Sequence, residues 1–165
     1  MIKLDTSSLV MIAKLDFWDV VKKMHGDLII TRGVWEEAVE EGKKKGKQDA
    51  FIIEKKIKEK VITIHPSKQE YPEMKLGKGE TETIHAAIDE SVPAMIEDVR
   101  PRVIGSNLGL EVVHLPLVFI KAYLETTWTE QDYEDALQKY ALHMSLSTEQ
   151  VVFFRNIKDL IKKSR

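Results

Sequence analysis

Acidic residues recur in this sequence where one predicted element of secondary structure gives way to the next. Asp5 ends the first strand-like run, Asp98 follows another such run at 94–96, and Glu37 falls in the first turn of a predicted helix. Carboxylates that converge repel one another unless a cation neutralises them. Ligand sets made only of oxygen favour Mg²⁺ or Mn²⁺ over zinc. These acids therefore predict a divalent-metal site, although Asp and Glu at helix starts also have a structural explanation.

Two further acids, Glu80 and Glu82, lie in the first turn of another predicted helix. They are two residues apart, about 200° around a helix, so they cannot both face one site. Glu80 shares a helical face with Ile84 and Ala87. The spacing alone leaves open which of the two acids belongs with the others.

The composition and the motifs exclude several other kinds of catalytic and binding site. The 165 residues include no cysteine, which excludes disulfides, thiolate zinc sites and cysteine nucleophiles. The five histidines show no metal-ligand spacing, and Lys78 lacks the following Ser or Thr of a phosphate-binding P-loop. No apolar run approaches the roughly 20 residues of a membrane span, and no signal sequence opens the chain. We therefore expect a globular protein of the cytoplasm.

Charge is segregated along the chain although the net charge is only −2. Eight lysines and three acids between Lys43 and Lys60 give +5, whereas eight acids and two lysines between Glu70 and Asp98 give −6. An acidic centre beside a basic lobe suits a metal-dependent enzyme that acts on a polyanion. The alternative is that these charges are ordinary solvated helix faces.

Strand-like runs alternate with helical patterns, which predicts an α/β fold with a central parallel sheet of about five strands. All strands of a parallel sheet end at the same edge, so Asp5 and Asp98 are expected to converge there. The hydroxyls of residues 6–8 are expected to cap a helix, and the lysine run at 42–46 to form an exposed loop. The predicted strands span 2–5, 27–31, 61–64, 94–96 and 110–113.

After Pro116 the patterns are helical only, at 117–124, 129–143 and 148–163, and Thr129 with Asp132 resembles a capping box. The apolar stripes of this part of the chain exceed what a core of 125 residues needs. We expect some of that surface to be buried in a homodimer.

Four segments together resemble PIN domains in order and spacing. They are MIKLDTSSL at 1–9, VWEEAV at 34–39, LGKGETETIHAA at 76–87 and IEDVRPRVIGSNLGL at 96–110. The resemblance implies a three-layer α/β/α domain over residues 1–125, with a helical extension at 126–165 packed on the same domain. It also implies a Mg²⁺- or Mn²⁺-dependent nuclease, because PIN domains are mostly ribonucleases and include the toxins of VapC-type toxin–antitoxin pairs.

Matched by motif, the resemblance implies that the metal-binding and catalytic acids are Asp5, Glu37, Asp98 and one of Glu80 and Glu82, of which Glu82 fits the motif better. The sequence departs from the pattern in two places. Ile96 stands where many relatives have Thr or Ser, and His114-Leu115-Pro116 replaces Gly-Thr. Glu97 adjoins Asp98 and could share or replace its role.

The sequence thus predicts an endonuclease that hydrolyses RNA, single-stranded or structured, with water activated by a carboxylate-bound metal. An antitoxin protein is a further partner that the resemblance implies. The alternative is a non-catalytic module of the same fold that binds RNA or a protein. Candidate contacts to the substrate are Thr6, Lys43, Lys44, Lys45, Lys47, Arg100 and Arg102.

Overall fold

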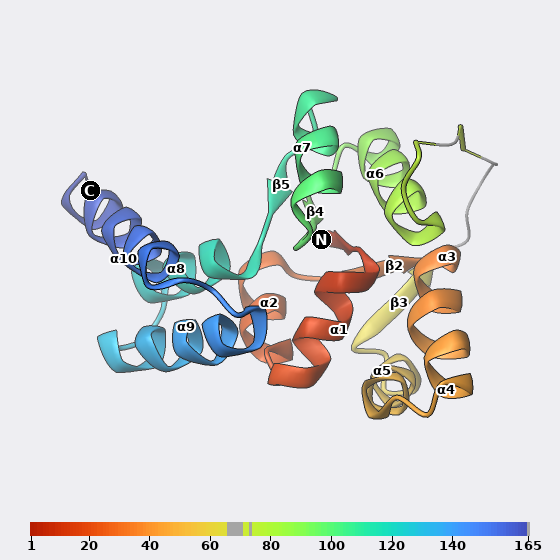
Figure 1. The fold of residues 1–165 in the computed structure, drawn as a ribbon, viewed down its shortest axis with the longest axis horizontal. Coiled ribbons are helices and arrows are strands. Elements are labelled where there is room, and N and C mark those ends of the chain that lie inside the picture. The colour runs from red at the N-terminus through yellow and green to blue at the C-terminus, as the bar shows by residue number, and fades with distance from the viewer. Residues whose placement is uncertain (66–70, 73, 165) are drawn as a thin grey trace. The chain divides into compact units, whose positions relative to one another are not determined.

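A computed structural model of the chain describes residues 1–65, 71–72 and 74–164. They divide into two compact units, Met1–His114 and Leu115–Arg165 (Figure 1). The proline and glycine residues of 66–79 predict a loop there, and part of that segment lies outside the described residues. The packing of an extension at 126–165 on a domain at 1–125 stays a prediction.

The first unit is built on a sheet of five parallel strands in the order β3-β2-β1-β4-β5. This confirms the predicted fold class. The residues of β1 and β2 are all buried, as expected for strands that helices cover on both faces. The bounds are Ile2–Leu4 for β1, Leu28–Thr31 for β2, Ile62–His65 for β3, Ala94–Met95 for β4 and Val112–Val113 for β5.

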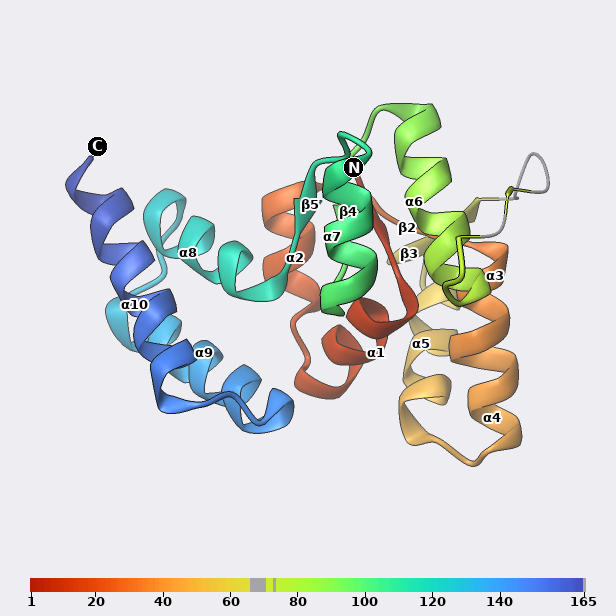
Figure 2. The same ribbon diagram turned by 45° about the horizontal axis from the view of Figure 1, so that its top comes forward.

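The connecting helices form two layers, one on each side of the sheet. Figures 1 and 2 show α6 and α7 on the opposite side of the strands from α1, α2 and α5. Crossovers between parallel strands are right-handed. The chain runs in one direction from β1 to β3 and in the opposite direction from β3 to β5, so the helices of the second part must cover the other face of the sheet. These helices are α1 (Thr6–Leu15), α2 (Trp18–His25), α5 (Gln48–Lys58), α6 (Lys78–Glu90) and α7 (Val99–Asn107).

The strand order reverses between β1 and β4, which pair directly, with Lys3 opposite Ala94 and Leu4 opposite Met95. In open parallel sheets a ligand crevice forms at such a reversal, outside the carboxyl ends of the strands. Asp5 follows β1 at this edge, and its backbone N–H donates to the carbonyl of Met95 at 3.2 Å. Asp98 follows β4 at the same edge.

One continuous helical segment follows β2, made of α3 (Arg32–Trp35), the π-helical η1 (Glu36–Glu41) and α4 (Gly42–Lys44). The prediction of an exposed loop at 42–46 is therefore wrong for residues 42–44, which are helical. Gly42 is buried, and a Cβ atom there would lie 2.8 Å from the Cβ of Ala50. Helix α4 thus continues because its backbone packs closely on α5.

The core on the α6 side of the sheet is formed by Ile84, Ala87, Ala94, Ile96 and Leu110.

A charge also lies within the sheet, where the buried Lys3 ammonium of β1 pairs with Glu90, at the end of α6, at 3.0 Å. This pairing offsets part of the cost of placing an ammonium group in a buried strand.

The second unit contains three helices, α8 (Leu115–Glu125), α9 (Glu130–Met144) and α10 (Thr148–Lys163). The capping box of Thr129 and Asp132 is confirmed at the start of α9. Helix α8 begins two residues earlier than expected, because Pro116 is accommodated in a first turn, where its missing N–H is not needed. Among the described residues, no helix is long and apolar enough to span a bilayer.

Candidate metal and nucleic-acid site

Asp5 is fully buried and is the N-terminal cap of α1. Its carboxylate accepts hydrogen bonds from the Ser8 backbone N–H and the Ser7 hydroxyl, both at 2.8 Å. The cap of this helix is therefore Asp5, and the expectation that the hydroxyls of residues 6–8 provide it is wrong. Burial raises the pKa of Asp5 to about 7, the bonds from Ser8 and Ser7 oppose that rise, and the charge of Glu97 adds to it.

The two acids after β4 have different environments. The Glu97 side chain is 3% exposed and lies close enough to Asp5 to raise its pKa, whereas the Asp98 side chain is exposed. Alternation along the extended chain sends successive side chains to opposite sides, so only one of these neighbours points inward. The buried acid after β4, whose charge acts on Asp5, is thus Glu97 rather than the motif-matched Asp98.

Glu37 connects three elements near the end of β1. Its Oε2 accepts from the Thr6 hydroxyl of α1 at 2.6 Å, and its Oε1 accepts from the Gly79 N–H of α6 at 2.9 Å. A Cβ atom on Gly79 would lie 2.6 Å from Glu37 Oε2 and 2.7 Å from Thr6 Oγ1. Residue 79 must therefore lack a side chain for these groups to meet.

The two glutamates of α6 also differ in position. The buried Glu82 of α6 accepts a hydrogen bond from the Gly33 N–H of α3 at 2.7 Å, and this bond connects α6 to α3. Glu80 turns back to its own helix start and accepts from the Gly77 N–H at 2.8 Å. The contacts of Glu80 are those of a helix cap, whereas Glu82 faces the interior beside α3.

The oxygen donors in this region fit a hard divalent cation. Asp5 and Glu97 are two buried carboxylates that follow adjacent strands, and the pKa of Asp5 is raised mainly because burial disfavours its negative charge. Mg²⁺ commonly keeps several waters and binds proteins through one or two carboxylates. Within the described part of the chain, however, no group of three or more His, Cys, Asp or Glu lies close enough together to hold a metal.

The predicted substrate contacts lie in two other places. Lys43 and Lys45 pair with Glu54 at 2.8 Å and with Glu41 at 3.3 Å. Figures 1 and 2 show α4, which carries Lys43 and Lys44, at the end of its helical segment away from α6. On α7, Arg100 is exposed and Arg102 is half-buried near His114, whose pKa is lowered to about 4 by burial and by the Arg102 charge.

A cluster that the sequence analysis did not identify lies beside Glu37 and Glu82. Arg32 and Lys78 both bind Glu36, and the Arg32 guanidinium lies 4.0 Å above the Trp35 ring. The sequence contains one signal for this cluster. A cationic residue directly precedes both Gly33 and Gly79, and the backbone N–H groups of these glycines bind Glu82 and Glu37.

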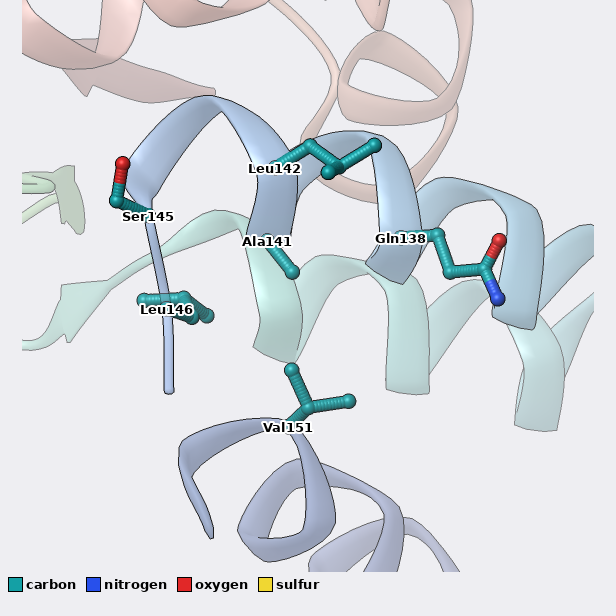
Figure 3. Close-up of a pocket in the computed structure, with 6 residues that line it drawn as sticks. All are labelled: Gln138, Ala141, Leu142, Ser145, Leu146 and Val151. Carbon is teal, nitrogen blue, oxygen red and sulfur yellow. The ribbon is translucent and has the colours of Figure 1, made fainter. Parts of the chain in front are cut away.

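The cavity shown in Figure 3 belongs to the second unit and is separate from these acids. It lies where the turn after α9 meets the start of α10, and has a volume of about 520 Å³. Its lining is mainly apolar and contains no carboxylate: Gln138, Ala141, Leu142, Ser145, Leu146 and Val151.

A family model described as a PIN domain (DUF3368) matches residues 1–139. The chain belongs to the PIN-domain family. Among solved structures, a PilT N-terminus domain protein from the archaeon Sulfolobus solfataricus is similar, with a TM-score of 0.54 and 13% identity over 78% of this chain and 98% of that one. This likeness supports the PIN-like fold.

A domain of a functionally unknown protein from Methanocaldococcus jannaschii has a TM-score of 0.49 and 16% identity, over 69% of this chain and 89% of that one. No curated protein matches this PIN-domain chain.

Proposed function

We propose that this PIN-domain protein is a Mg²⁺- or Mn²⁺-dependent ribonuclease. The observation that supports this most is the burial of both Asp5 and Glu97, which follow the two strands that flank the reversal of strand order. Burial disfavours the charged form of the Asp5 carboxyl, which a bound cation would stabilise, and PIN domains typically act as nucleases. The cytoplasmic location expected from the sequence stays a prediction.

The residues of the site have distinct parts in this proposal. Asp5 and Glu97 would hold the cation, which when bound supplies an activated water and stabilises the charge that develops on the phosphate. Ser7 and Ser8 orient the Asp5 carboxylate, and Thr6 and Gly79 orient Glu37. Glu82 fixes α6 against α3. The chain thus provides a rigid frame in which a scissile phosphate can be aligned.

The motif match and the geometry differ about the acid after β4, so we propose that Glu97 carries more of the function than Asp98. Glu97→Gln is expected to lower Mn²⁺-dependent cleavage of a single-stranded RNA at least tenfold more than Asp98→Asn does, because Glu97 is buried and its charge acts on Asp5, whereas Asp98 is exposed. Equal rates for Glu97→Gln and the wild type would contradict this assignment.

The decisive experiment for the function compares the wild type with Asp5→Asn at saturating Mn²⁺. Asp5→Asn keeps the shape of the side chain and removes its charge, so cleavage should be lost while binding of RNA in chelator is retained. Asp19→Asn, at an exposed acid in α2, is the matched control and should cleave as the wild type does. Cleavage by Asp5→Asn at the wild-type rate would assign the activity to a contaminant or to another site.

A non-catalytic role is the second candidate, and one observation favours it. The described residues do not gather three metal ligands, and Glu37 and Glu82 accept hydrogen bonds from other parts of the protein. Tight binding of RNA without cleavage under any divalent ion would support this alternative.

The toxin role is a further proposal that rests on the family resemblance. A short overlapping reading frame upstream of the gene, encoding a DNA-binding protein, would support it. The same neighbour would be the candidate antitoxin partner.

A further inference from the structure

Glu36 holds two cations that come from different parts of the chain. Its Oε1 accepts from Arg32 Nε at 3.0 Å, and its Oε2 accepts from Lys78 Nζ at 2.5 Å. The two cations are separated by 46 residues, since 78 − 32 = 46, and meet because α3 packs against the start of α6. Each carboxylate oxygen of Glu36 thus has its own cationic partner.

This arrangement corresponds to the recognition of a phosphodiester. A phosphodiester carries one negative charge shared by two non-bridging oxygens, as the Glu36 carboxylate does. Arg is suited to such a group because its planar fork matches two oxygens, and Lys is a common phosphate ligand. Arg32 and Lys78 form a pair that can exchange the carboxylate for a phosphate without changing the balance of charge.

The position of the pair relates it to the proposed active site. The residue after Arg32 is Gly33, whose N–H holds Glu82 at 2.7 Å, and the residue after Lys78 is Gly79, whose N–H holds Glu37 at 2.9 Å. Both cations are therefore adjacent in the chain to backbone groups that bind the acids.

The two cations are accessible, and one of them is held in place. The side chains of Arg32 and Lys78 are 52% and 58% exposed, and that of Glu36 is 30% exposed. Arg32 lies over the ring of the half-buried Trp35 at 4.0 Å, a cation–π contact that orients the guanidinium. Exposed ion pairs are weak, so an incoming anion can displace Glu36.

We propose that Arg32 and Lys78 form a phosphate subsite for the RNA strand, and that Glu36 occupies this subsite until RNA displaces it. The inference rests on the proposed ribonuclease function and names residues through which its substrate is bound. Glu36 thus competes with RNA for Arg32 and Lys78, and this competition weakens the binding of RNA. The subsite is distinct from the predicted substrate contacts at Lys43, Lys44, Lys45 and Lys47.

The test measures the binding of a fluorescently labelled single-stranded RNA in chelator, where no metal-dependent cleavage occurs. Glu36→Gln is expected to bind RNA roughly threefold to tenfold more tightly, because the internal competitor loses its charge. Glu111→Gln removes the same charge at an exposed position elsewhere and should leave the affinity nearly unchanged.

The double variant Arg32→Gln/Lys78→Gln provides the second arm. Loss of two phosphate contacts should reduce the slope of log affinity against log salt by about 1.4, at about 0.7 for each single-strand contact. The control Lys22→Gln/Lys23→Gln makes the same charge change at exposed positions of α2 and should keep the wild-type slope. Circular dichroism establishes that all variants are folded.

Two results would overturn the inference. One is a Glu36→Gln protein that binds RNA no more tightly than the wild type, together with equal salt slopes for the two double variants. The other is displacement of RNA by poly-glutamate as efficient as displacement by unlabelled RNA, which would indicate a site for acidic protein segments.

Failure of the proposed function gives a different pattern. In that case no divalent ion supports cleavage that depends on Asp5, while the effects of Glu36 and of the cation pair on RNA binding remain.

Discussion

Protonation of Asp5 should make stability depend on pH. The carboxyl titrates near its ordinary pKa of 3.8 in the unfolded chain and at about 7 in the fold, where it is buried. Between these values the folded state binds more protons, so the free energy of unfolding contributed by Asp5 falls as pH rises from about 4 to about 7. Asp5→Asn removes this penalty. We expect the variant to be more stable than the wild type at pH 8, by on the order of 4 kcal/mol.

Denaturant unfolding of both proteins at pH 8 and at pH 4.5 measures this difference, which should shrink at the lower pH. His114 acts in the opposite sense, because its pKa is lowered to about 4 by burial and by Arg102. Below about pH 6.5 the unfolded state binds the His114 proton more readily than the folded state does. The free energy of unfolding therefore falls as pH decreases from about 6.5 to about 4. This effect is present in both proteins and cancels in the comparison. Stability curves that run parallel across the pH range would contradict the assigned environment of Asp5.

At the scale of elements, the start of α6 is held by the contact of Gly79 with Glu37 and Thr6. Gly79→Ala places a methyl group 2.6 Å from Glu37 Oε2, so α6 must shift relative to η1 and α1. The expected loss of stability is about 1–3 kcal/mol. Cleavage should fall as well, because displacement of Glu37 disturbs the frame around Asp5.

Ile88→Ala is the control for this prediction, since it changes an exposed residue near the other end of α6. Urea unfolding and the cleavage assay, applied to both variants, separate a local effect on the site from a general effect on the helix. A Gly79→Ala protein with wild-type stability and activity would show that the junction tolerates a side chain.

At the scale of the whole molecule, apolar side chains of the second unit remain exposed. Leu142 is 83% exposed, Leu160 is 66% exposed and Phe153 is 58% exposed. The homodimer expected from the sequence would bury part of this surface, since contiguous exposed apolar area favours association. We expect light scattering at tens of micromolar protein to give the mass of a dimer, and Leu142→Ser to shift the population toward monomer.

A change at an exposed polar residue of the same helix that does not line the cavity shown in Figure 3, Gln131→Ser, should leave the dimer intact. A wild-type protein that is strictly monomeric under these conditions would remove the homodimer prediction and leave the proposed catalysis unaffected.

Local patterns in the sequence were sufficient for the order and type of most elements. Short apolar runs between helical patterns predicted five parallel strands, because a strand covered on both faces is apolar along most of its length. The capping box at Thr129 predicted the start of α9, since it depends only on residues three apart. The α/β class and the shared edge of Asp5 and Asp98 followed from the same local information.

Contacts between distant segments decided the rest. Whether Glu97 or Asp98 is the buried acid depends on the orientation of the chain where it leaves β4, and Glu36 meets Lys78 only because α3 and α6 pack together. The helical conformation of 42–44 likewise depends on the approach of Gly42 to Ala50. The sequence by itself determined which residues could supply oxygen ligands and cations. Only the tertiary structure decided which of them meet, because burial and pairing depend on neighbours that are remote in the chain.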